Sequence, residues 1–146
     1  MIVLDTDVCV GILRGNPAVS ARFRANQRDV RIPFMVAAEL FYGAEKSGDP
    51  DHNREQVEAF LGSVDILESD ENAVRTFGYV KAYLARAGFA IPDADVLVAA
   101  TALSRSCPLA TSNVRHFSRI WGLQLQNWFA APPAVSSWHE RKDKTK

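Results

Sequence analysis

Two residue types that often build functional sites are scarce in this chain. It has two cysteines, Cys9 and Cys107, in no CxxC or CxxH pair. Neither a thiolate metal site nor a disulfide framework is therefore indicated, and a reducing cytoplasm fits best. The three histidines, at positions 52, 116 and 139, lack the spacing of zinc ligands. The shortage argues against a zinc enzyme, and we expect surface or packing roles for these histidines.

Long apolar runs and an excess of charge are also missing. No apolar run approaches the ~20 residues that span a bilayer, and the opening MIVLDTD lacks the basic and apolar regions of a signal peptide, so we expect a cytoplasmic protein without membrane contact. The formal net charge is +0, which argues against a protein that holds nucleic acid mainly through a large positive field. A local basic rim is still compatible with an RNA substrate, and arginines at 14, 22, 24, 28, 31, 115 and 119 are candidates for it.

The apolar pattern predicts one α/β domain over residues 1–130 and a flexible tail over 131–146. Strands are predicted at 1–4, 30–33, 64–67, 108–111 and 123–127. Helices are predicted at 8–14, 17–27, 34–47, 51–61, from a Ser69 cap to Gly88, and from an Asp93 cap to about Ser104. Strands alternating with helices predict a parallel sheet covered on both faces. Trp121 and Trp128 are expected to anchor the last strand to the core.

Three carboxylates stand in unusually apolar surroundings. Asp5 ends the first strand, and in an open α/β sheet the ligand crevice lies beyond the strand ends. Glu39 has only Met35, Val36, Tyr42 and Gly43 at helical contact spacing, and Asp95 has only Ile91, Pro92, Val98 and Ala99. Each acid also has a structural explanation: a helix cap for Asp5, a boundary residue with its head in water for Glu39, and a helix-dipole contact for Asp95.

Together the three acids predict a metal site. Carboxylates brought to one crevice from different elements repel one another unless a cation neutralises them, and oxygen ligands suit Mg²⁺ or Mn²⁺. Such a cation leaves positions open for water and phosphate. Phosphodiester hydrolysis is the chemistry that this arrangement favours.

Five segments resemble, in this order, the VapC group of PIN-domain ribonucleases: MIVLDTD, AAELFYGAEKS, IPDADVLVAATAL, LATSNVRHF and GLQLQNW. The resemblance covers about residues 1–128. It implies an α/β/α sandwich with a central parallel sheet and divalent-metal-dependent endoribonuclease activity. It further implies the role of toxin beside a VapB-type antitoxin, and usually a homodimer.

Carried over by position, the resemblance implies that Asp5, Glu39 and Asp95 are the catalytic acids and metal ligands. Asn113 matches a fourth polar position, although a turn or cap role explains it equally well. Two positions depart from the family: Asp7 stands where Asn is common, which adds negative charge near the site, and no Ser or Thr occurs near Val36.

Two other functions are compatible with parts of the sequence. The segment from Val3 to Val8 resembles the opening of haloacid-dehalogenase-type phosphatases, with Asp5 as nucleophile and Asp7 as acid. That mechanism expects a later essential lysine, for which the chain offers no convincing candidate, and it gives Glu39 no role. A PIN module that binds RNA or protein without cleaving is the second alternative, and the three intact acids argue against it.

Overall fold

The computed structural model of this protein describes residues 1–130, so the tail predicted over 131–146 lies outside the described residues. Five parallel strands form one sheet in the order β3-β2-β1-β4-β5. Their bounds are β1 (Ile2–Leu4), β2 (Val30–Pro33), β3 (Asp65–Leu67), β4 (Leu109–Ala110) and β5 (Leu125–Gln126). The sheet confirms the predicted parallel α/β architecture and all five predicted strands.

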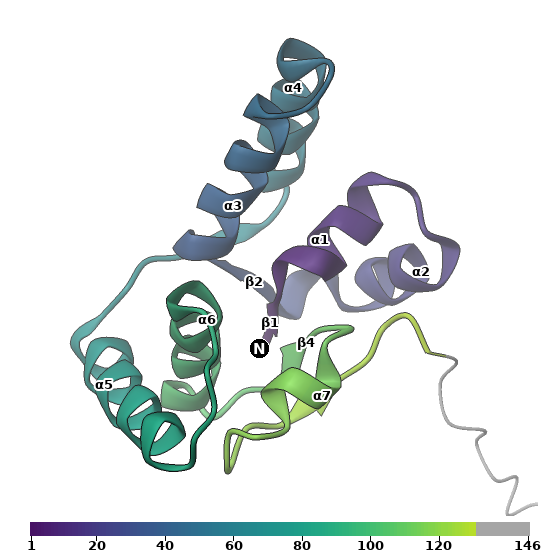
Figure 1. The fold of residues 1–146 in the computed structure, drawn as a ribbon. Coiled ribbons are helices and arrows are strands. Elements are labelled where there is room, and N and C mark those ends of the chain that lie inside the picture. The colour runs from purple at the N-terminus through teal and green to yellow at the C-terminus, as the bar shows by residue number, and fades with distance from the viewer. Residues whose placement is uncertain (131–146) are drawn as a thin grey trace, which may run out of the picture.

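Helices connect the strands and cover the sheet. They are α1 (Thr6–Leu13), α2 (Pro17–Asn26), the short 3-10 helix η1 (Gln27–Asp29), α3 (Phe34–Glu45), α4 (Pro50–Leu61), α5 (Glu71–Arg86), α6 (Asp93–Ser104) and α7 (Val114–Phe117). The α5–α6 pair and the α1–α2 pair lie on opposite sides of β1 (Figure 1). Val3, Leu4, Ile32 and Leu109 of the central strands have no measurable exposure, so the apolar core lies between the sheet and these helices.

All strands run parallel, but the side of the sheet to which the chain adds successive strands changes between β1 and β4. From β1 it proceeds to β2 and β3 on one side, and after β3 it crosses back to β4 and β5 on the other. Such a reversal leaves a crevice at the carboxyl ends of the two strands that flank it. Asp5 follows β1 directly, so the fold itself delivers this residue to the crevice.

Two helix starts differ from the prediction. The carboxylate of Asp70, rather than Ser69, caps α5, because it accepts a hydrogen bond from the Ala73 N–H at 2.8 Å. Asp93 is the first residue inside α6 and not its cap; Pro92 occupies the cap position without a side-chain hydrogen bond. The Asp93 carboxylate instead lies 3.0 Å from Nζ of Lys81 on α5. Each prediction was wrong because sequence spacing does not distinguish between adjacent residues of similar chemistry.

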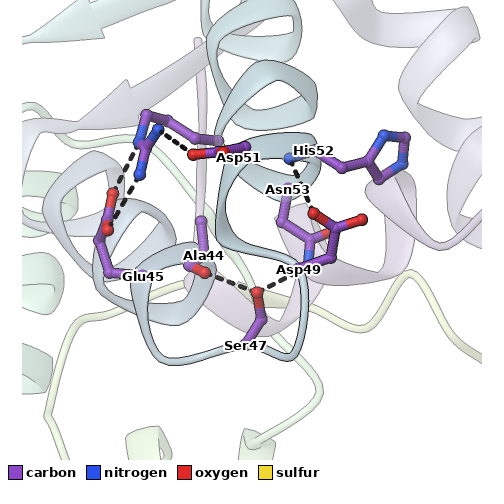
Figure 2. A network of polar contacts seen from close by, with 8 residues as sticks. Ala44, Glu45, Ser47, Asp49, Asp51, His52 and Asn53 are labelled. Carbon is purple, nitrogen blue, oxygen red and sulfur yellow. Dashed lines mark hydrogen bonds and ion pairs between the residues drawn. The ribbon is translucent and has the colours of Figure 1, made fainter.

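Polar contacts fix the turn between α3 and α4. The Ser47 hydroxyl donates to the Ala44 carbonyl at 2.6 Å and accepts from Asn53 Nδ2 at 2.8 Å (Figure 2). Arg54 of α4 binds Glu45 of α3 through two nitrogens, at 2.7 and 3.1 Å. These contacts hold α3 and α4 together as the hairpin seen in Figure 1, and α3 carries Glu39.

The two tryptophans near the last strand have different environments. Trp128 is fully buried, which confirms its predicted anchoring role, and its indole N–H donates to Gln126 Oε1 at 3.0 Å. Trp121 is 85% exposed, so the same prediction was wrong for this residue. It precedes Gly122, whose φ of +82° marks a tight turn at the surface.

Candidate metal-dependent nuclease site

A cleft of about 830 Å³ opens at the carboxyl edge of the sheet. Its lining includes all four residues predicted for the site, which are Asp5, Glu39, Asp95 and Asn113, together with Thr6, Asp7 and Arg14. These residues come from the ends of β1 and β4 and from α1, α3 and α6. The structure therefore places the separately predicted acids around one crevice.

Asp5 is the most buried member of the site, with 7% of its surface exposed. Its Oδ1 accepts the Thr6 N–H at 2.9 Å, so it does cap α1, and its Oδ2 accepts the Thr111 hydroxyl at 2.8 Å. Burial, and next the charge of Asp7, raise the pKa of Asp5 from 3.8 to about 6, against the two hydrogen bonds that lower it. The helix cap and the site residue are thus one and the same carboxylate.

Asp7 ties α1 to the turn that follows β4. Its Oδ2 accepts from both the backbone N–H and the hydroxyl of Ser112. Its Oδ1 is buried without a hydrogen-bond partner among the described residues. A buried carboxylate oxygen without a partner is costly, and a cation or ordered water in the cleft is the kind of group that satisfies it.

Glu39 is half-buried and has a polar partner that its own helix does not supply. The Thr6 hydroxyl donates to Glu39 Oε2 at 2.7 Å. This contact joins the start of α1 to α3 and holds the Glu39 carboxylate at the cleft. Sequence reasoning missed Thr6, since the two residues are 33 positions apart and only the fold brings them together.

Asp95 lies in the first turn of α6, beside α7. Nε2 of His116 on α7 is 3.4 Å from Asp95 Oδ2, close enough for an ion pair when the imidazole is protonated, although the two groups do not form a hydrogen bond. Burial raises the pKa of Asp95, and the nearby His116 opposes that effect. His116 was expected to have only a surface or packing role, and its position beside a site acid had no signal in the sequence.

Asn113 lies at the exposed rim of the cleft. It occupies the N-cap position of α7, but its side chain makes no capping hydrogen bond. Its N–H donates to the Thr111 hydroxyl at 3.0 Å, and that hydroxyl in turn donates to Asp5. The Asn113 side chain is therefore free of the capping role that the sequence allowed.

Within residues 1–130, no three His, Cys, Asp or Glu side chains stand close enough together to enclose a metal ion by themselves. This does not exclude Mg²⁺, which usually keeps several waters and is held by only one or two carboxylates. Across the same residues, no helix is long and apolar enough to cross a membrane.

Comparisons with known proteins agree with this architecture. The sequence profile of the PIN domain matches residues 2–122. A tRNA(fMet)-specific endonuclease VapC from Shigella flexneri is 37% identical over 127 residues, which cover 86% of this chain and 96% of that protein. Ribonuclease VapC2 from Haemophilus influenzae is 34% identical with the same coverage.

Solved structures give the same result. A DNA-bound VapBC complex from Salmonella typhimurium contains a chain that superposes with a TM-score of 0.83 and 34% identity, over 87% of this chain and 97% of the other. A chain of VapBC-1 from Haemophilus influenzae superposes with a TM-score of 0.80 and 29% identity, over 89% and 100% respectively. The profile match and the relatives above 30% identity cover most of the sequence, and they do not favour a phosphatase. The chain belongs to the PIN-domain family, and within it to the VapC-type ribonucleases.

Proposed function

We propose that this protein is a divalent-metal-dependent endoribonuclease that serves as the toxin of a toxin–antitoxin pair in the cytoplasm. One observation supports the proposal most strongly: Asp5, Glu39 and Asp95 all line one cleft, at the point where the strand order reverses. The family relationship supports the same activity.

The donor set of the cleft fits Mg²⁺ or Mn²⁺. Burial raises the pKa of both Asp5 and Asp95, and repulsion from Asp7 adds to each shift, so a cation that stabilises the ionised carboxylates suits this cleft. Asp7 also has a buried oxygen without a hydrogen-bond partner among the described residues. We propose that Asp5, Glu39 and Asp95 hold the cation, one or two of them directly and the rest through the waters that the cation keeps, with Asn113 as a further oxygen donor at the rim. A cation bound there would activate water and stabilise the charge that develops on the phosphate.

The remaining contacts orient these side chains. Thr6 holds Glu39 at the cleft through its hydroxyl, and Thr111 holds Asp5. Arg14, which is exposed at the cleft and has no carboxylate within ion-pair distance among the described residues, is placed to contact a substrate phosphate. Hydrolysis then forms a bond from water oxygen to phosphorus and breaks the bond to one ester oxygen of the RNA chain.

A VapB-type antitoxin is the proposed partner, and a homodimer the proposed assembly. A second groove of about 740 Å³ between α1, α3 and α4 shares Thr6, Arg14 and Glu39 with the cleft. One extended protein segment could therefore occupy the groove and reach the acids, where an arginine of that segment would replace the cation. Copurification from native cells tests this, and a chain that is freely tolerated when expressed alone and captures no small partner would contradict the toxin role.

Cleavage assays on two variants separate the ribonuclease from the phosphatase. Asp5→Asn should abolish cleavage of structured RNA, whereas Asp7→Asn should leave it largely intact, because an amide oxygen can still accept from Ser112. Two relatives carry the name tRNA(fMet)-specific endonuclease, so initiator tRNA is the first RNA to test. EDTA should stop the reaction.

The phosphatase alternative predicts a different pattern. There Asp7 is the general acid, a role worth roughly 10²–10⁴ in rate, so both substitutions would destroy turnover of a phosphomonoester. No lysine of the described residues lines the cleft, which disfavours that mechanism. Phosphomonoester turnover that is lost in both variants, without RNA cleavage by the unmodified chain, would overturn the proposal.

A further inference from the structure

An aromatic ring and a guanidinium lie against each other on the surface of the protein, outside the lining of the cleft. The guanidinium carbon of Arg119 lies over the ring of Phe89, 4.3 Å from its centroid. Phe89 is 36% exposed and Arg119 is exposed, so both side chains are accessible from solvent. We call these two residues the Phe89–Arg119 platform. Nothing in the metal site uses either side chain.

Both members of the platform are held by ordered backbone. Gly88, with φ of +80°, ends α5, and the N–H groups of Phe89 and Gly88 donate to the carbonyls of Leu84 and Ala85 at 2.9 and 3.2 Å. This is the paired hydrogen-bond pattern of a Schellman helix end, which fixes the position of Phe89. Arg119 precedes the buried Ile120, whose N–H donates to the Phe117 carbonyl at 3.0 Å, so its segment is anchored in the core.

The platform joins two segments that border Asp95. The segment with Phe89 leads into α6, whose first turn contains Asp95. The segment with Arg119 follows α7, where His116 lies 3.4 Å from Asp95 and Asn113 lines the cleft. The contact between Phe89 and Arg119 therefore joins the segment that leads into α6 to the segment that follows α7.

Two arginines of α7 and the segment that follows it have no acidic partner within residues 1–130. Arg115 and Arg119 are exposed and have no carboxylate within ion-pair distance in that part of the chain. By contrast, Arg31, Arg54, Arg75, Lys81 and Arg105 each pair with an acid. Because the net charge is +0 and the cleft is acidic, exposed arginines without an acidic partner are the kind of group that attracts a polyanion such as RNA.

From these observations we infer that the Phe89–Arg119 platform stacks an unpaired base of the RNA substrate outside the cleft. Aromatic rings and guanidinium planes are the groups on which proteins stack splayed-out RNA bases, and such stacking tolerates any base. The platform thus selects single-stranded RNA, a loop or bulge, over a helix whose bases stay stacked on each other. The inference rests on the proposed ribonuclease function and specifies its substrate class.

Steady-state kinetics on an RNA hairpin that the unmodified protein cleaves in its loop tests the inference. Phe89→Leu keeps an apolar side chain without a π face and should raise KM about tenfold with kcat nearly unchanged. Phe89→Trp should retain the original KM. Arg119→Lys keeps the charge but not the plane, and it should also raise KM. Arg75→Lys, the same substitution at an exposed arginine of α5 that pairs with Glu71, is the matched control and should have no effect.

An abasic nucleotide identifies the stacked base. The abasic nucleotide is moved through the loop one position at a time. At one position it should raise the KM of the unmodified protein about tenfold, and at that same position it should leave the KM of Phe89→Leu unchanged. Equal KM values for Phe89→Leu and the unmodified protein would overturn the inference while the ribonuclease stands. Loss of antitoxin binding without a change in KM would overturn it in favour of a protein interface. Absence of RNA cleavage by the unmodified protein would overturn both proposals.

Discussion

The proposed cation site needs Asp5 in its ionised form, but that ionised form lowers the stability of the folded protein. The burial of Asp5 and its neighbour Asp7 raise its pKa to about 6, so the folded protein holds a proton there at pH values where the unfolded chain has lost it. Between about pH 4 and pH 6 the folded state therefore binds more protons than the unfolded state, and stability falls as the pH rises through that window. Above pH 6 the ionised Asp5 costs up to ~3 kcal/mol in the metal-free protein, at 1.36 kcal/mol per pKa unit.

Asp5→Asn should accordingly stabilise the metal-free protein at pH 7.5, by on the order of 1–3 kcal/mol, because the amide carries no charge and can still accept the Thr6 N–H. Urea unfolding in EDTA measures the effect, and the advantage should shrink as the pH falls through 6 toward 4, because Asp5 of the folded protein is then protonated and uncharged. A variant that is less stable than the unmodified protein at pH 7.5 would contradict this electrostatic account of the site.

Thr6 is the residue that positions Glu39. Thr6→Val keeps the shape of the side chain and removes the hydroxyl that donates to Glu39 at 2.7 Å. A hydrogen bond to a charged group contributes ~1.5–3 kcal/mol, so RNA cleavage should fall at least about tenfold. Thr6→Ser retains the donor and should keep most of the activity. Equal activity in the Val and Ser variants would show that Glu39 does not depend on this contact.

At the scale of elements, α5 provides a test of the capping assignment. Asp70→Ala removes the carboxylate that accepts the Ala73 N–H and that lies 3.0 Å from Arg105, and it should cost about 1 kcal/mol. Ser69→Ala, the substitution at the residue predicted from the sequence, should be nearly neutral. The urea midpoints of the two variants measure the difference, and the reverse order would favour the original prediction.

Element type was more predictable than the details of element ends. Strands such as 30–33 and helices such as α5 have the periods of 2 and 3.6 residues that a single sequence reveals. The four-residue helix α7 was missed, because one turn is too short to display a period. Trp121 was misplaced for a related reason, since apolar neighbours do not determine whether a turn residue faces the core.

At the scale of the whole molecule, the site depends on the reversal of strand order between β1 and β4. The sequence predicted that the acids share a cleft, because each was out of place on its own element and the order of motifs matched a known family. It did not predict which neutral groups hold them. The partners of Glu39 and Asp5, the hydroxyls of Thr6 and Thr111, come from other elements, and only the completed fold brings these side chains together.

The central claim is that Asp5, Glu39 and Asp95 hold the cation on which RNA cleavage depends, either directly or through its bound waters. Titration with Mn²⁺, followed by the loss of the free-ion EPR signal, tests it most directly. Asp5→Asn, Glu39→Gln and Asp95→Asn should each weaken binding, by roughly tenfold or more. Asp93→Asn is the matched control, because Asp93 is exposed and pairs with Lys81, and it should bind Mn²⁺ as the unmodified protein does. Mn²⁺ binding that is unchanged in the three site variants, or absent from the unmodified protein, would contradict the account.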